Sequence, residues 1–357
     1  MENIGKAMVF KGIKSPFNLE EFKFPLLKPG EVLVRNSYST VCTSDLHTFY
    51  GRRHSCTNSV LGHEVIGEIV DLSQGGISDY QGNSLKVGDK VTWTVFAFDP
   101  LSENTLKGFP QKSERLYKYG HEEINEEYQL NGGFSTHTHL RKGTAIFKLP
   151  SNLSLKEAAP INCSHATIAG AIRMAGDISD KNVLVSGVGM LGLSACAQAK
   201  FLGANQVWAQ DINSEKLNSS EEFGADQTFL YPEKEIETAN QEIGGIDIVI
   251  ETSGSPEAIE KCIGLLGIGG TIILVGSVFP QRDLAINGEV LVRKILTIKG
   301  LHNYTPEDLQ TAIEFVSTAK NRFPFEKLVG AEFPLDELEK AFELGQEGKH
   351  FRVGVKP

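Results

Sequence analysis

Two short segments near the start of the chain carry residues that bind metals. Residues 42–47 read CTSDLH, and residues 62–64 read GHE. Thiolates and imidazoles are zinc ligands, and a catalytic zinc site takes three protein ligands and leaves a fourth position for water or substrate. Cys42 and His63 are therefore candidate ligands of a catalytic metal, and a third ligand must come from elsewhere.

Cys163 is the best candidate for that third ligand. It lies in residues 159–167, APINCSHAT, shortly before a glycine-rich motif. Cys196 and Cys262 fall within helical patterns and are expected to pack as small hydrophobic side chains, whereas Cys56 is ambiguous. Any one thiol alone could belong to the core, but Cys42 and Cys163 together with His63 favour metal ligation.

The glycine-rich motif, GVGMLG at residues 187–192, lies between a short apolar strand and a helix of small residues. Gly187 permits the tight turn, Gly189 lets the backbone approach a pyrophosphate, and Gly192 permits close packing of the helix on the strand. Phosphates would lie at the helix N-terminus, where unpaired N–H groups favour negative charge. A βαβ turn without a ligand also uses glycines, but the complete strand, loop, helix and strand context favours a dinucleotide site.

Asp211 ends the second strand of this unit, 24 residues after Gly187. Its carboxylate can accept hydrogen bonds from both ribose hydroxyls, and it would repel a 2′-phosphate. The following residues, Ile212 and Asn213, supply no arginine that would reverse the preference. The sequence therefore predicts NAD rather than NADP.

Composition limits the other classes of function. A chain of 357 residues with 40% hydrophobic residues predicts two globular domains. No apolar run approaches the roughly 20 residues that span a bilayer, so no membrane association is expected. The net charge of −10 argues against nucleic acid as a partner. Five scattered cysteines form no disulfide framework, and their odd number favours a reducing, cytoplasmic compartment.

The order of predicted elements changes along the chain. Alternating apolar residues predict a strand-rich, antiparallel or barrel-like unit from about 7 to 96, followed by a long polar excursion from 99 to 129. Strands and helices alternate from 182 to 299, which predicts a parallel, doubly wound sheet. The tail is mixed and is expected to pack back on the first domain. A strand is predicted at residues 295–299, at the end of the βαβ series.

These motifs in combination resemble the zinc-dependent medium-chain alcohol dehydrogenases over essentially the whole chain. The resemblance implies an α/β protein with a GroES-like β-rich catalytic domain and a doubly wound Rossmann domain. The catalytic domain is expected at residues 1–163 and to be completed by 303–357, and the dinucleotide-binding domain at 164–302. The implied reaction is NAD-linked interconversion of a small primary or secondary alcohol and its carbonyl compound.

The resemblance also implies roles for particular residues. Cys42, His63 and Cys163 would bind the catalytic zinc. Glu64 would lie beside the metal and could ligate it when substrate is absent, and Asp45 would orient His63. Ser44 and His47 would form a proton relay. Thr167 would contact the nicotinamide, and Arg352 would contact the pyrophosphate.

One feature departs from the family pattern. Many members carry four closely spaced cysteines for a structural zinc in the lobe that here spans residues 95–112, and this lobe has no cysteine. Phe96, Phe98, Asp99 and Glu103 provide no tetrahedral thiolate set. One catalytic zinc per subunit and no structural zinc are therefore expected, with the lobe held by packing or hydrogen bonds.

The sequence indicates the type of reaction more clearly than the substrate. Arg52 and Arg53 lie in a loop that by family analogy lines the substrate site, and two guanidinium groups suit a carboxylate, phosphate or phosphonate. A solvated surface pair is the open alternative, and Lys118, His121 and Arg115 could extend such a patch or face water. Segments 110–112, 118–122 and 302–304 resemble a subgroup of the family associated with phosphonate breakdown.

Three alternatives stay open at this stage. The substrate could be a small anionic hydroxyl compound, a neutral polyol or an amino alcohol of the sorbitol or threonine type. The chain could instead be a non-catalytic NAD(H)-binding sensor, since a fold alone does not fix a function.

An edge strand at 295–299 also predicts a homodimer or homotetramer.

Overall fold

The computed structural model describes residues 3–53, 55–233 and 235–357. The chain forms two compact units. The first comprises Met1–Cys163, Thr305–Ser317 and Phe325–Pro357, and the second comprises Ser164–Tyr304 and Thr318–Pro324. The predicted fold class, a β-rich domain plus a doubly wound parallel sheet, is confirmed.

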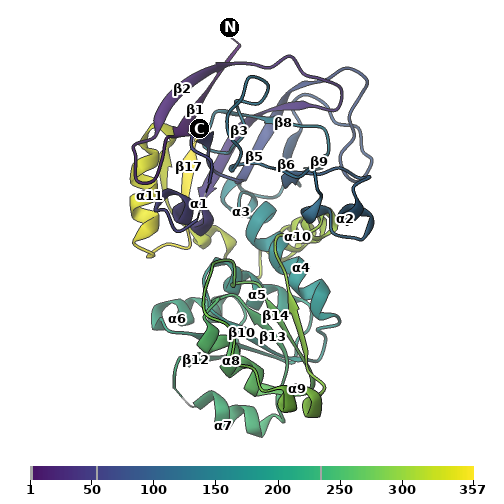
Figure 1. Ribbon diagram of the computed structural model, residues 1–357, viewed down its shortest axis with the longest axis vertical. Coiled ribbons are helices and arrows are strands. Elements are labelled where there is room, and N and C mark those ends of the chain that lie inside the picture. The colour runs from purple at the N-terminus through teal and green to yellow at the C-terminus, as the bar shows by residue number, and fades with distance from the viewer. Residues whose placement is uncertain (1–2, 54, 234) are drawn as a thin grey trace. The chain divides into compact units, whose positions relative to one another are not determined.

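The first unit is built mainly from antiparallel strands (Figure 1). A three-stranded sheet has the order β2-β1-β4, with bounds Ile4–Phe10 for β1, Asn18–Lys23 for β2 and Ser59–Val60 for β4. A larger sheet has the order β16-β17-β3-β5-β6-β7, with β8 paired to β3 and β9 to β6. Its strands are β3 (Val32–Val41), β5 (Glu64–Leu72), β6 (Lys90–Ala97), β7 (Tyr117–Lys118), β8 (His137–Leu140), β9 (Thr144–Lys148), β16 (Val329–Pro334) and β17 (Arg352–Lys356).

The C-terminal strand belongs to this sheet. Strand β17 pairs antiparallel with β3 and parallel with β16; Figure 1 shows it in yellow beside the dark N-terminal strands. Apolar side chains from the two ends of the chain, including Phe10, Phe17, Phe49 and Phe342, share one core cluster. The helices of this unit are α1 (Thr43–Phe49), α2 (Glu103–Leu106), α3 (Leu155–Ala158), α10 (Pro306–Ala319, which continues into the second unit) and α11 (Leu338–Gln346).

The second unit is a six-stranded parallel sheet in the order β12-β11-β10-β13-β14-β15. Helix α5 is buried on nearly all sides, because it carries mainly small and apolar residues. The strands are β10 (Asn182–Ser186), β11 (Gln206–Asp211), β12 (Gln227–Leu230), β13 (Ile246–Glu251), β14 (Leu266–Leu274) and β15 (Thr297–Gly300). The helices are α4 (Ala166–Ala175), α5 (Met190–Phe201), α6 (Ser214–Glu222), α7 (Glu235–Glu242), α8 (Pro256–Leu265) and α9 (Gly288–Lys294).

The predicted strand at 295–299 begins later than expected. Ile295 has a φ of 54° and ends α9 in the left-handed region, so it cannot belong to a strand. Strand β15 therefore starts at Thr297 and lies at the edge of the sheet. Strand β12 and helices α6 and α7 have weak sequence patterns, because their segments are polar.

A buried carboxylate stabilises the first unit away from the predicted site. Glu31 accepts hydrogen bonds from the Tyr128 hydroxyl at 2.6 Å and from the Lys28 amide at 2.9 Å, and its other contact is with Nε2 of His139 at 2.9 Å. Burial alone would raise the pKa of Glu31, but these partners outweigh it and lower that pKa below the ordinary 4.5. Glu31 therefore stabilises the fold as a carboxylate.

We expect Tyr128→Phe to lower the free energy of unfolding by about 2 kcal/mol at neutral pH, since a hydrogen bond to a charged group is lost. The loss should be full above about pH 4.5 and should shrink as Glu31 is protonated at lower pH. Thermal unfolding between pH 7 and pH 4 measures this. Tyr50→Phe is the control, since its hydroxyl makes no hydrogen bond within the described part of the chain; equal effects of both variants at all pH values would contradict the account.

Candidate metal centre and dinucleotide loop

The register of the large sheet brings the predicted metal ligands together. Thr40 near the end of β3 lies opposite Glu64 at the start of β5, so the residues that follow one strand and precede the other are neighbours. These residues are Cys42, the N-cap of α1, and His63. Gly62 makes the turn into β5 with a φ of 88°, which favours glycine.

Cys163 reaches the same place from a distant part of the chain. It lies in a π-helical turn, Ile161–His165, an irregularity often found at functional sites. The side chain of Asn162 donates hydrogen bonds to the carbonyls of His63 and Trp93, each at 3.0 Å, and so fixes this turn against His63. Sequence reasoning missed Asn162, although it stands beside the candidate ligand.

Four side chains form the only cluster of potential metal ligands in the described part of the chain. One ligand atom each from Cys42, His63, Glu64 and Cys163 lies within 4.8 Å of all the others. Two thiols and an imidazole are the donor set that zinc prefers. These residues therefore fit a zinc ion.

The pKa values of the two thiols in this cluster shift in opposite directions. The hydrogen bond from Cys163 lowers the pKa of Cys42, and Arg352 lowers it further, whereas the same hydrogen bond and burial raise the pKa of Cys163. The protein alone therefore favours one thiolate and one thiol. A divalent cation would favour the thiolate form of both, because metal ligation requires deprotonated cysteine.

Asp45 lies against the imidazole of His63. Its Oδ1 lies 3.3 Å from Nδ1 of His63, and its carboxylate also accepts hydrogen bonds from the amides of Cys42 (2.9 Å) and Gly62 (3.3 Å). Burial opposes a charge on His63, but Asp45 and Cys42 outweigh it and raise its pKa. Because Asp45 faces Nδ1, Nε2 is left as the nitrogen for a cation.

The sheet register places Arg352 beside Glu64 and Cys42. Val353 is opposite Val41, so the start of β17 meets the end of β3. The Arg352 guanidinium donates to both carboxylate oxygens of Glu64, at 2.6 and 2.7 Å, and to Sγ of Cys42 at 3.4 Å. Burial alone would raise the pKa of Glu64, but Arg352 outweighs it and lowers that pKa.

This pairing bears on two predicted roles. Glu64 belongs to the cluster, and its carboxylate accepts hydrogen bonds from Arg352 and the Thr40 hydroxyl, which would compete with metal ligation. Contact of Arg352 with a cofactor pyrophosphate stays a prediction. Neither Thr40 nor the Arg352–Glu64 pair has a signal in the sequence, since 288 residues separate the partners of that pair.

The predicted relay residues lie on the first helix of the site. Ser44 and His47 are both half-buried residues of α1. The Ser44 hydroxyl accepts a hydrogen bond from Arg53 at 2.7 Å. Burial and the charges of Arg52 and Arg53 lower the pKa of His47, which favours the neutral imidazole.

The glycine loop adopts the geometry that the motif predicts. Gly187 has a φ of 87°, and an added Cβ on Gly192 would lie 2.0 Å from the carbonyl oxygen of Gly187. An added Cβ on Gly189, the N-cap of α5, would meet nothing within 4 Å. The backbone at this helix N-terminus is therefore open at Gly189, as the approach of a phosphate group would require.

Asp211 holds the same loop from the end of β11. Its Oδ2 accepts a hydrogen bond from the Val188 amide at 2.7 Å, and its Oδ1 accepts one from Asn213 at 2.9 Å. Thr252 donates to the Gly187 carbonyl at 2.6 Å from the neighbouring strand end, a contact without a signal in the sequence. Thr167 is half-buried in α4.

The lobe without cysteines is held by polar side chains. The Ser113 hydroxyl accepts hydrogen bonds from the amide of Asp99 (3.1 Å) and the hydroxyl of Ser102 (3.0 Å). The side chain of Asn104 donates to the Lys112 carbonyl at 2.9 Å, and its amide donates to Glu114 at 3.1 Å. Hydrogen bonds therefore connect the two ends of this lobe.

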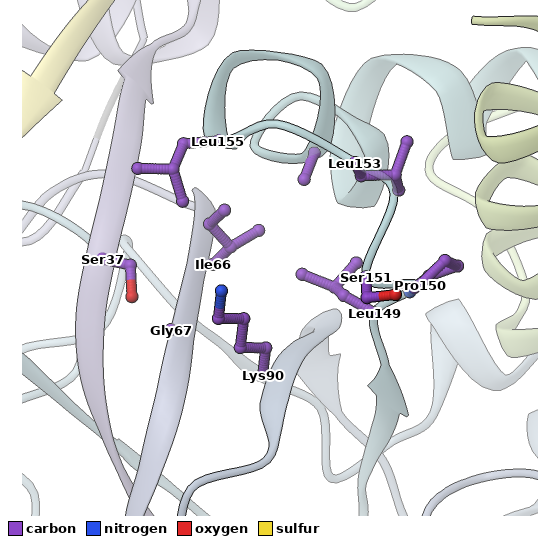
Figure 2. A pocket seen from close by; sticks show the side chains of 10 residues that line it. Ser37, Ile66, Gly67, Lys90, Leu149, Pro150, Ser151, Leu153 and Leu155 are labelled. Carbon is purple, nitrogen blue, oxygen red and sulfur yellow. The ribbon is translucent and has the colours of Figure 1, made fainter.

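A separate pocket in the first unit contains none of the predicted site residues. Figure 2 shows Lys90 among mostly apolar side chains at the strands β5 and β6 and the turn after β9. Its lining includes Ile66, Lys90, Leu149, Leu153 and Leu155. No thiol or imidazole faces this pocket, so it is not the candidate reaction site.

Both units match known protein families. Residues 28–151 match the alcohol dehydrogenase GroES-like domain, and residues 190–318 match the zinc-binding dehydrogenase domain. An alcohol dehydrogenase of Geobacillus stearothermophilus is 31% identical over 96% of both chains. An L-threonine 3-dehydrogenase of Pseudoalteromonas translucida is 25% identical over 91% of this chain and 92% of its own. A crystal structure of an alcohol dehydrogenase from Thermotoga maritima superposes with a TM-score of 0.92 at 28% identity, covering 99% of each chain.

The fold and the donor cluster define an oxidoreductase that acts on CH–OH groups. The chain belongs to the zinc-dependent medium-chain alcohol dehydrogenase family. Every helix in the described ranges is too short or too polar to span a bilayer.

Proposed function

We propose that this protein is a zinc-dependent, NAD-linked dehydrogenase that interconverts a small alcohol and its carbonyl compound. The convergence of Cys42, His63 and Cys163 within 4.8 Å carries the proposal. Turnover needs a substrate held beside this cluster in the first unit and a dinucleotide held by the glycine loop of the second. The alcohol dehydrogenase from Geobacillus stearothermophilus supports the reaction class.

Cys42, His63 and Cys163 would hold the zinc ion. Bound there, zinc supplies a Lewis acid for the oxygen of the alcohol or carbonyl group. Asp45 holds the tautomer of His63 that presents Nε2. The Ser44 hydroxyl would accept the proton of the substrate hydroxyl as it gives up its own, and neutral His47 would take up the released proton and pass it towards solvent.

The second unit would bind NAD. The bound nicotinamide supplies the hydride acceptor. Gly187, Gly189 and Gly192 shape the pyrophosphate site, and Asp211 would exchange its bond with the Val188 amide for the ribose hydroxyls. Thr167 beside the nicotinamide and Arg352 at the pyrophosphate complete the proposed contacts.

Asp211→Ser should reduce the preference for NAD over NADP by at least about tenfold, because the carboxylate that repels a 2′-phosphate is removed. The ratio of kcat/KM for the two cofactors measures this. Asp226→Ser is a control, since Asp226 holds the amide of Val207 on the same strand, away from the loop. An unchanged ratio in Asp211→Ser would remove the assigned role.

One zinc ion per subunit is expected, because the lobe at 95–112 is held by hydrogen bonds. Protein stripped with a chelator should lose NAD reduction with alcohols and regain it with one equivalent of zinc. Elemental analysis and an alcohol panel measure both. Two firmly bound equivalents would contradict the single site, and full activity of the stripped protein would contradict the function.

Within this function, the substrate we favour is a small alcohol with an anionic group, of the hydroxyalkylphosphonate kind. Arg53 supports it, because this side chain reaches Ser44 beside the metal cluster. Arg52 is exposed and fits the solvated alternative. A neutral polyol or an amino alcohol is the second candidate substrate, favoured by the similarity to an L-threonine 3-dehydrogenase. The alternative to an enzyme is a non-catalytic NAD(H) sensor, and turnover in the alcohol panel would exclude it.

The edge position of β15 supports a homodimer or homotetramer, since a second copy would cover its open hydrogen bonds. All five cysteines are free, which supports a reducing, cytoplasmic location.

A further inference from the structure

The polar segment at residues 99–129 contacts the turn before the predicted ligand His63 at Gly120. An added Cβ on Gly120, whose φ is 78°, would lie 2.6 Å from the Gly62 carbonyl oxygen, so the two backbones are in close contact. The next side chain, His121, lies with its ring centroid 5.5 Å from that of His63. The strand β7 and the residues after it therefore form one wall beside the predicted ligand His63.

Lys118 is the charged residue of this wall. It ends β7 two residues before Gly120 and is half-buried. Burial lowers the pKa of Lys118, and the charges of Arg53 and Lys112 lower it further. The carboxylate of Glu122 opposes this lowering of the Lys118 pKa, and it accepts a hydrogen bond from the Lys118 backbone amide at 3.1 Å.

Arg53 approaches the same region from the turn after α1. Its backbone amide donates to the His47 carbonyl at 3.1 Å, which fixes the turn, and its Nη1 donates to the Ser44 hydroxyl at 2.7 Å. A guanidinium has five N–H donors, and this bond uses one of them. Within the described ranges neither Arg53 nor the ammonium group of Lys118 forms an ion pair with a carboxylate.

Arg53 and Lys118 are both half-buried cations. The net charge is −10, with 45 acidic and 35 basic residues, so carboxylates are abundant. A half-buried ammonium group without a counter-ion is costly, and a bound anion would offset that cost. Arg offers a planar fork of donors and Lys a point charge, a combination that suits a carboxylate or a tetrahedral oxyanion.

We propose that Arg53 and Lys118 form an anion-binding subsite beside the metal cluster, which takes the carboxylate or phosphonate group of an alcohol substrate. The proposal rests on the proposed function for the reaction, whereas the anionic ligand is inferred from the two cations. Arg53 would exchange its bond to Ser44 for the anion, and Lys118 would supply the second charge.

Two measurements test the subsite. The first is the ratio of kcat/KM for a 2-hydroxyalkylphosphonate or a 2-hydroxy acid to that for the neutral diol of the same length, in zinc-loaded enzyme with NAD. Lys118→Gln and Arg53→Gln should each lower this ratio by about tenfold to a hundredfold, as expected for a lost charged hydrogen bond. Lys118→Arg should restore most of it. Lys107→Gln is the matched control, because this lysine of the same excursion is exposed and pairs with Glu103.

The second measurement is calorimetric binding of methylphosphonate and of acetate, which carry no hydroxyl group. An anion could also bind zinc or the glycine loop, so the difference in Kd between the unmodified protein and Lys118→Gln is the readout. A loss of affinity in Lys118→Gln supports the subsite, and the two anions distinguish a phosphonate from a carboxylate ligand.

The outcomes separate the two proposals. Turnover of neutral alcohols with no anion preference and no effect of Lys118→Gln on the ratio overturns the subsite and leaves the dehydrogenase. Absence of turnover with any alcohol, together with anion binding that depends on Lys118, overturns the function and leaves the subsite. Anion binding equal in the unmodified protein and in Lys118→Gln overturns the subsite in either case.

Discussion

Cys42→Ala and His63→Ala should each lower kcat by at least about a thousandfold, because a three-ligand metal site that loses one ligand no longer holds its Lewis acid. Both side chains belong to the only donor cluster in the described ranges. The Kd for NADH should change little, since the glycine loop belongs to the other compact unit. Steady-state kinetics, elemental analysis and NADH fluorescence titration measure the three quantities.

A matched cysteine separates ligation from packing. Cys262→Ala removes another buried thiol, which lies in α8 far in sequence from the cluster, and this variant should retain zinc and turnover. Burial raises the pKa of Cys262 to about 12, so it is a neutral packed group. Retained activity in Cys42→Ala, or loss of zinc in Cys262→Ala, would overturn the ligand assignment.

Gly192→Ala should weaken NADH binding by at least about a hundredfold while leaving zinc content unchanged. The added Cβ would lie 2.0 Å from the Gly187 carbonyl oxygen, so the loop backbone must move away from the geometry that receives a pyrophosphate. Fluorescence titration with NADH measures the affinity.

The control for this variant is Gly264→Ala in α8. Its added Cβ meets nothing within 4 Å, and alanine favours a helix by about 1 kcal/mol over glycine, so binding should persist and stability should rise slightly. Normal NADH affinity in Gly192→Ala would show that the close contact between helix and loop is not required for the cofactor.

The parts of the site that are local in sequence could be predicted from it. Strand β10, the glycine loop, α5 and β11 up to Asp211 are continuous, and each follows from short-range rules for strands, turns and helix termini. Cys42 and Asp45 are equally local, since the side chain of Asp45 caps the amide of the residue three positions earlier.

Contacts set by strand register could not be predicted. The Arg352–Glu64 pair depends on the pairing of β17 with β3 and of β3 with β5, which no local pattern specifies. Cys163 was a candidate by its type and position, but its approach to His63 depends on a turn held by Asn162. Arg52 and Arg53 are indistinguishable in the sequence, yet one is exposed and the other contacts Ser44.

X-ray absorption at the zinc edge of the zinc-loaded protein identifies the metal ligands directly. Two sulfur ligands at about 2.3 Å and nitrogen or oxygen ligands at about 2.0 Å are expected. Cys163→Ser should remove one sulfur from that shell. A shell without sulfur, or a shell unchanged in Cys163→Ser, would contradict the assignment of Cys42, His63 and Cys163 as the metal centre.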